Sequence, residues 1–74
     1  MKLPVLSGAE AARAFSKIGY ESDGQHGSHM ILRHSRPPHR RISIPNHREL
    51  AKGTLRALIR EAGLTVEEFR LLAG

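Results

Sequence analysis

Apolar residues recur at helical spacing early in the chain. One face of the stretch after residue 7 carries Ala12, Phe15 and Ile18. This spacing predicts an amphipathic helix whose apolar face packs on a core. Ser7 and Glu10 stand three residues apart, as in a capping box, where the serine oxygen accepts a helix N–H and the glutamate reaches back to the cap. The helix is therefore predicted to begin after Ser7 and to end before Gly19.

The same periodicity returns in the last third of the chain. Gly53 and Thr54 open a second predicted helix, whose apolar positions follow the i, i+3, i+4, i+7 pattern: Leu55, Leu58, Ile59 and Ala62. Gly63 is placed to end this helix. Residues 65–68 form a second capping box, which predicts a short closing helix with Phe69 and Leu72 turned toward the core.

Between the helices the pattern changes to the period of two that is typical of strands. The segment His29–His34 has the strongest strand composition, and residues 20–25 alternate more weakly. We therefore predict a hairpin that turns around His26 and Gly27, with Asp23-Gly24 as a competing turn signal.

A third strand is predicted over residues 40–44, because consecutive prolines precede it in a loop and Pro45 follows it. Alternation places Met30, Leu32, Ile42 and Ile44 on one sheet face. The outer face then carries His29, Arg33, Arg41 and Ser43, with Ile31 among them. The expected fold is a two-layer α+β domain of order α-β-β-β-α plus a short C-terminal helix, with a three-stranded antiparallel sheet. Double-stranded-RNA-binding modules have this arrangement.

Length and composition limit the class of protein. The 74 residues suffice for one domain, which we expect to span residues 1–74 and to have a thin core. The chain has no cysteine, so disulfides and thiolate chemistry are excluded and a reducing compartment fits. The first residues carry too short an apolar run for a secretory signal, and no stretch approaches the length of a membrane span. We therefore expect a cytoplasmic protein that does not contact a membrane.

The charge of the chain is strongly basic and unevenly distributed. The chain has twelve Lys and Arg residues and seven Asp and Glu residues, which gives a formal net charge of +5. No carboxylate lies between Gly24 and Arg48, whereas all five histidines and four arginines do. This basic block favours a polyanion such as RNA, or an acidic protein, as the partner. The alternative is that the charge only keeps a small protein soluble.

The tripeptide Gly27-Ser28-His29 is the candidate centre for chemistry. A glycine permits a tight turn, and the residues after it are held at the start of a strand. An imidazole at the start of this strand has the proton affinity needed to give or take a proton near neutral pH. The alternative from the residues alone is an ordinary hairpin with an exposed histidine.

An ordered set of short motifs across nearly the whole chain resembles the HicA toxin family. These motifs are Leu3-Pro4-Val5-Leu6-Ser7-Gly8, Gly27-Ser28-His29, Ile44-Pro45-Asn46-His47, Lys52-Gly53-Thr54-Leu55, Ala62-Gly63-Leu64-Thr65 and Glu68-Phe69. The resemblance implies a small mRNA interferase with a double-stranded-RNA-binding-like fold, silenced by a HicB-like antitoxin. Two features depart from the family: the connector Arg36–Arg41 is longer and more basic than expected, and His26 stands where Arg or Lys is usual.

The resemblance also assigns roles to residues. His29 is the expected catalytic histidine of a metal-independent endoribonuclease without a cofactor. The residues expected to hold the mRNA substrate are Gly27, Ser28, Arg33, Arg41, Ser43, His47 and Lys52. One alternative is a module that binds double-stranded RNA without cutting it. Another is a metal site built from the five histidines, which alternation disfavours because it places His29 and His34 on opposite sheet faces.

Overall fold

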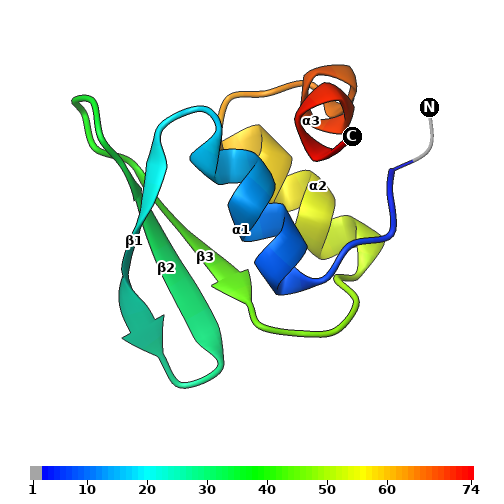
Figure 1. Cartoon of the computed structure of the whole chain (residues 1–74), viewed down its shortest axis with the longest axis horizontal. Helices are drawn as coiled ribbons and strands as arrows, with labels where there is room; N and C mark the ends of the chain where they lie inside the picture. Colours follow the sequence, from blue (N-terminus) through cyan, green and yellow to red (C-terminus); the bar gives the residue numbers. More distant parts are fainter. Residues whose placement is uncertain (1–2) are drawn as a thin grey trace.

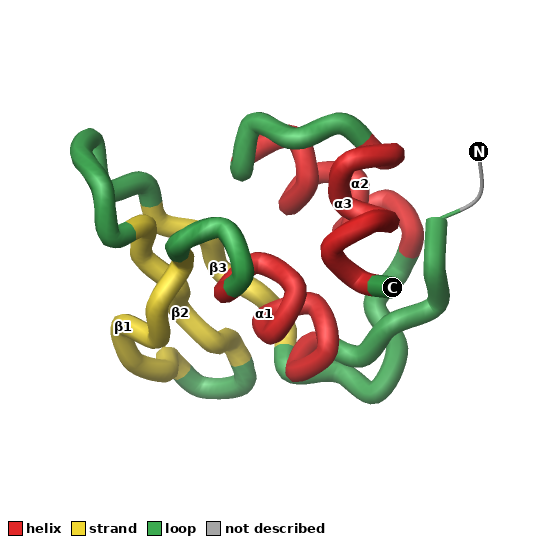
Figure 2. Tube along the Cα trace, turned by 45° about the horizontal axis from the view of Figure 1, so that its top comes forward, coloured by secondary structure: helices red, strands yellow, loops and turns green. Residues whose placement is uncertain are grey.

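The computed structural model describes residues 3–74 as three helices and three strands. They follow in the order α1 (Gly8–Ser16), β1 (Tyr20–His26), β2 (His29–His34), β3 (Arg41–Pro45), α2 (Lys52–Glu61) and α3 (Val66–Ala73). The strands form one antiparallel sheet in the order β1-β2-β3. Figures 1 and 2 show the helices gathered on one side of the sheet, so the predicted α+β layers are confirmed. None of the helices in residues 3–74 has the length and apolarity to cross a membrane.

Both predicted capping boxes are present. Ser7 and Glu10 exchange hydrogen bonds at the start of α1, with N–O distances of 2.9 and 3.1 Å. Thr65 and Glu68 do the same at the start of α3, at 2.8 and 3.1 Å. Helix α2 begins one residue earlier than predicted, and its N-cap, Ala51, offers no side-chain hydrogen bond.

The hairpin is confirmed, but its turn lies one residue later than predicted. His26 pairs with His29, so the turn consists of Gly27 and Ser28. Gly27 has φ +58°, which suits a first turn residue of the type that matches strand twist. Asp23-Gly24 does not turn the chain. It forms an irregularity in β1, where the register with β2 shifts between Ser22 and Gln25.

The third strand lies one residue later than predicted at each end, and its inward residues are those that alternation indicated. Leu32, Ile42 and Ile44 are buried against the helices, while Met30 is half-buried. The predicted apolar face of α1 is confirmed: Phe15 is buried, and Ala12 and Ile18 are half-buried and pack against the core. The helix also buries Ala11 and Ala14, and Phe15 packs against Phe69 of α3 with ring centroids 5.1 Å apart.

The start of α1 lies directly against the end of β3. The N–H of Gly8 donates to the carbonyl oxygen of His47 at 2.9 Å. A side chain at Gly8 would collide with the carbonyl oxygen of Pro45. Glycine is therefore required here by the close approach of two backbones, which fixes the helix layer relative to the sheet.

Candidate functional site

His29 is the first residue of β2 and lies at the rim of the sheet. The turn Gly27-Ser28 holds it on one side, and the β2–β3 pairing places Pro45 opposite it on the other. Its side chain is exposed and makes no hydrogen bond with residues 3–74. Backbone pairing thus fixes the position of His29 in the sheet, and its imidazole is exposed to a ligand.

A second imidazole lies beside it, from a residue that we did not predict to be part of the site. His26 is the direct cross-strand partner of His29, so both side chains lie on the outer sheet face. Directly opposed residues have Cβ atoms about 5 Å apart. The prediction missed this pair because it centred the turn on His26 and Gly27. A two-residue turn at Gly27-Ser28 makes the residues on either side of it a pair.

The register confirms the predicted outer face. Ile31 of β2 pairs with Ser43 of β3, and Arg33 pairs with Arg41. Ser43 and Arg41 are exposed, whereas Ile31 and Arg33 are half-buried. The face therefore presents a histidine end and an arginine end, separated by a small neutral stretch.

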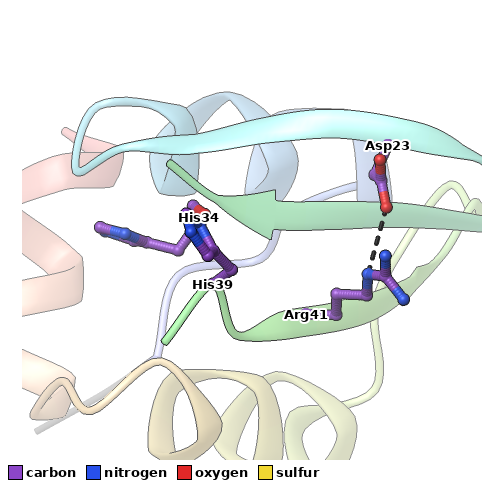
Figure 3. Close-up of polar contacts among 4 residues, drawn as sticks. All are labelled: Asp23, His34, His39 and Arg41. Atoms are coloured by element: carbon purple, nitrogen blue, oxygen red, sulfur yellow. Dashed lines mark hydrogen bonds and ion pairs between the residues drawn. The ribbon is translucent and has the colours of Figure 1, made fainter. Parts of the chain in front are cut away.

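This face is less basic than the sequence alone indicated. The segment between Gly24 and Arg48 contains no carboxylate, but the first part of β1 lies before it and brings Glu21 and Asp23 onto the same face. Glu21 pairs with Arg33, and the carboxylate of Asp23 lies 3.2 Å from Nε of Arg41. Figure 3 shows this ion pair reaching across β2, from β1 to β3. Arg41 is thus already engaged by a protein carboxylate.

The loop after β3 belongs to the same end of the sheet as His29. The N–H of Asn46 donates to the carbonyl oxygen of Ser28 at 2.7 Å. The next residue, His47, is exposed, and its carbonyl oxygen accepts the hydrogen bond from Gly8. Ser28, His29 and the backbone of His47 are thereby held in one neighbourhood at the rim.

Lys52 is the one predicted RNA-binding residue that the fold does not bring to this face. It is the exposed first residue of α2. Figure 1 shows the start of α2 near the N-terminal segment and well away from the β1–β2 turn. Because α2 has no side-chain cap, its first N–H groups remain available to an anion.

The histidines at the opposite end of β2 have structural roles. Nδ1 of His34 accepts the N–H of Arg36 at 3.1 Å, so Nε2 carries the proton and donates to the carbonyl oxygen of Ile18 at 2.8 Å. Nδ1 of His39 lies 3.1 Å from the carbonyl oxygen of His34 and donates to it. Figure 3 shows both rings together, away from the Asp23–Arg41 pair. Within residues 3–74, no three His, Cys, Asp or Glu side chains are grouped so that they could hold a metal ion.

A family model described as the HicA toxin of bacterial toxin-antitoxin systems matches residues 8–64. No curated protein matches the chain. The matched range contains the hairpin, the outer sheet face and α2, and so covers the whole candidate site.

Proposed function

The chain belongs to the HicA toxin family, and on that premise we propose that it is the toxin of a toxin–antitoxin system that acts as an endoribonuclease on mRNA. His29 is the proposed catalytic residue. The observation that carries the proposal is its position: an exposed imidazole, held at the start of a strand beside a tight glycine turn. Such a group can approach an extended RNA strand and transfer a proton.

The proposed reaction uses the ribose 2′-hydroxyl as the nucleophile. A general base takes the proton from this hydroxyl, and its oxygen attacks the adjacent phosphorus. The bond from phosphorus to the leaving 5′-oxygen breaks, and a general acid donates a proton to that oxygen. DNA lacks the 2′-hydroxyl, so the mechanism restricts the substrate to RNA.

Two proton transfers are served best by two groups, and His26 is placed to be the second. It lies on the same face as His29 and directly across the strand pair. One imidazole in the neutral form and the other in the protonated form supply the base and the acid of this reaction. Which of the two acts as the base is decided by where the scissile phosphate lies on the face.

The arginine end of the outer face is proposed to hold the phosphates that flank the cut. Arg33 and Arg41 lie about four residues along the strands from the histidine pair, a distance of ~13 Å. Phosphate binding to Arg41 would replace its ion pair with Asp23, which is exposed and therefore weakly held. Ser28 and His47 supply polar groups at the His29 rim, and Ser43 supplies one between that rim and the arginine end.

The experiment that tests this proposal measures RNA cleavage by purified protein in the presence of a chelator. We expect His29→Ala to lower the cleavage rate by about 10² to 10⁴, the usual contribution of a general acid or base. His26→Ala should lower the rate and remove one limb of the pH–rate profile. An RNA with a 2′-deoxy nucleotide at the cut site is the matched substrate control and should stay intact. A folded His29→Ala protein that cleaves at the full rate would overturn the assignment.

The second candidate function is binding of double-stranded RNA without cleavage. It is favoured by the fold, which is consistent with the double-stranded-RNA-binding type. The same cleavage assay separates the two functions. Bound duplex that remains intact after prolonged incubation with the unmodified protein would favour the binding module.

A toxin of this kind requires a partner that silences it, and we propose a HicB-like antitoxin. An acidic protein surface placed over His29 and the arginine end would block RNA and match the net charge of +5. The partner would replace the same charge contacts that the RNA makes. Binding of antitoxin and binding of RNA should therefore exclude each other.

A further inference from the structure

A hollow of about 330 Å³ lies at the end of the sheet opposite to His29. It opens between the connector after β2 and the end of α2, where Ala62 and Gly63 form its far wall. The residues of the sheet and the connector that line it are Tyr20, His34, Arg36, Pro37, Pro38 and Arg40. His34 is five residues after His29, which separates the hollow from the histidine pair by ~17 Å along β2.

The connector that forms the near wall is held by hydrogen bonds. Besides the two contacts of the His34 and His39 rings, the backbone of His34 donates to the carbonyl oxygen of Arg40 at 2.8 Å. The backbone N–H of His39 donates to the carbonyl oxygen of Arg36, also at 2.8 Å. The connector is therefore preorganised, so a ligand there does not have to order a free loop.

Tyr20 supplies an unused donor to the hollow. Its side chain is only 3% exposed, and its ring packs edge-on against His34 with centroids 4.9 Å apart. The hydroxyl makes no hydrogen bond within residues 3–74. Every side-chain oxygen or nitrogen in that range that is closed off from solvent has a hydrogen-bond partner, so the hydroxyl oxygen must be accessible to solvent. It therefore opens into the hollow, where buried tyrosines normally have a hydrogen-bond partner.

The charges around the hollow favour an anion. Both arginines are exposed, and no carboxylate lines the hollow. The ring nitrogens of His34 are already used, so His34 contributes an apolar face and not a donor. Burial raises the pKa of Tyr20; the charge of Arg40 lowers it, and the charge of Glu61 adds to the rise. The polar groups of the hollow are thus two guanidinium groups and one phenol, all of them donors. Nη1 of Arg40 donates to the carbonyl oxygen of Glu61 at 3.5 Å, and the rest of this guanidinium group makes no hydrogen bond within residues 3–74.

We propose that this hollow is a second phosphate-binding site, which holds a backbone phosphate of the RNA strand several nucleotides away from the cut. The inference rests on the proposed function for the identity of the strand. A guanidinium group offers paired donors that match phosphate oxygens, and the phenol adds a third contact. Pro37, Pro38 and the His34 ring give a nucleoside an apolar surface to pack on. The site fixes the position of the RNA relative to His29.

The first experiment follows backbone amide signals of ¹⁵N-labelled protein while an oligonucleotide is added. A 2′-O-methyl oligonucleotide of about ten residues resists the proposed chemistry and matches a single-strand site in length. We expect shifts at Tyr20, Arg36 and Gly63 together with shifts at His29. No shift at the first three residues at saturation would overturn the proposal.

Variants then measure what the site contributes. We expect Arg36→Ala with Arg40→Ala to weaken oligonucleotide binding about tenfold or more and to reduce the salt slope by about 0.7 for each lost phosphate contact. The matched control is Arg13→Ala with Arg70→Ala, which removes the same charge from exposed positions on α1 and α3. Equal effects of the two double variants would show that net charge alone acts, and would overturn the site.

Tyr20 gives an independent readout because it is the only tyrosine and the chain has no tryptophan. Burial already raises the pKa of Tyr20 above its ordinary value of about 10. A phosphate bound beside the hydroxyl disfavours the phenolate, so the midpoint of its absorbance titration should rise further with oligonucleotide present. The groups that face it are His34, Arg36, Arg40 and Glu61. An unchanged midpoint at saturation would contradict the proposal.

Two further experiments are needed. One distinguishes a mononucleotide from an RNA strand as the ligand, and the other distinguishes failure of this inference from failure of the proposed ribonuclease activity. Uridine 5′-monophosphate that binds the hollow as tightly as the oligonucleotide would indicate a mononucleotide site and overturn the assignment to an RNA strand. RNA cleavage that is unaffected by the Arg36 and Arg40 changes would remove this inference and leave the ribonuclease standing. Shifts at the hollow in a protein that does not cut RNA would support the site and remove the ribonuclease.

Discussion

At the scale of single residues, two histidines of the same strand, His29 and His34, have different roles. His34 uses both ring nitrogens to join β2 to Ile18 and to the connector, so it has no capacity left for a ligand. His29 is exposed and makes no such bonds within residues 3–74. His34 is five residues after His29, an odd number, so alternation places the two side chains on opposite faces of the sheet. The environment of each ring, and not the residue type, determines its use.

Two glycines provide a prediction at this scale. Gly8→Ala should lower the free energy of unfolding by about 1–3 kcal/mol, because the new methyl group meets the backbone of Pro45, which cannot move aside easily. Gly53→Ala is the matched control: its new methyl group meets nothing within 4 Å in the first turn of α2. It should raise the free energy of unfolding by about 0.5–1 kcal/mol. Urea denaturation measures both, and equal effects of the two changes would contradict this packing.

At the scale of elements, α2 begins differently from the other two helices. Helices α1 and α3 have complete capping boxes, which satisfy N–H groups that a helix otherwise leaves free. Helix α2 begins after Ala51, which has the extended backbone of an N-cap but no side-chain acceptor. Its stability therefore comes from the burial of Leu55, Leu58 and Ile59 and not from its first turn.

This difference predicts that Ala51→Ser stabilises the protein. The serine hydroxyl would accept an N–H of the first turn, which raises the free energy of unfolding by about 0.5–1 kcal/mol. Thr65→Ala at the start of α3 is the opposite control and should lower it by about 1 kcal/mol. Thermal unfolding followed by circular dichroism measures both changes. An unchanged midpoint for Ala51→Ser would mean that the first turn of α2 is already satisfied, and would contradict the prediction.

At the scale of the whole molecule, β2 connects two chemically different ends. The histidine pair lies at the turn, and the hollow with its two arginines lies beyond the other end. Between them the outer face carries the neutral pair Ile31 and Ser43, and then two arginines beside two carboxylates, with Asp23 held against Arg41. A polyanion that touches both ends has to compete with these carboxylates only in the middle.

The antitoxin proposal leads to a prediction at this scale. A bound partner stabilises the folded state by mass action, by about 2.7 kcal/mol at a concentration of one hundred times its dissociation constant. We expect the thermal midpoint to rise with the partner, and to rise less with Arg33→Ala than with Arg70→Ala. High salt should reduce the rise, because the contacts are between charges. A midpoint that does not change with saturating partner would contradict the proposed interface.

The order of the elements, both capping boxes, the hairpin and the two sheet faces were predictable from the sequence. Each depends on residues that are close together in the chain: Ser7 with Glu10, Thr65 with Glu68, or the alternation of Met30, Ile31 and Leu32. Capping bonds span three residues, and the side-chain period of a strand is two. Local chemistry of this range can be read without knowing the fold.

The composition of the site was decided only by the tertiary structure. The pairing of His26 with His29 required the position of the turn to within one residue, because a shift of one changes every cross-strand neighbour. The ion pair between Asp23 and Arg41 joins β1 to β3 across β2, and the hollow depends on how α2 ends near the connector. These are contacts between distant segments, whose register and packing no local pattern specifies.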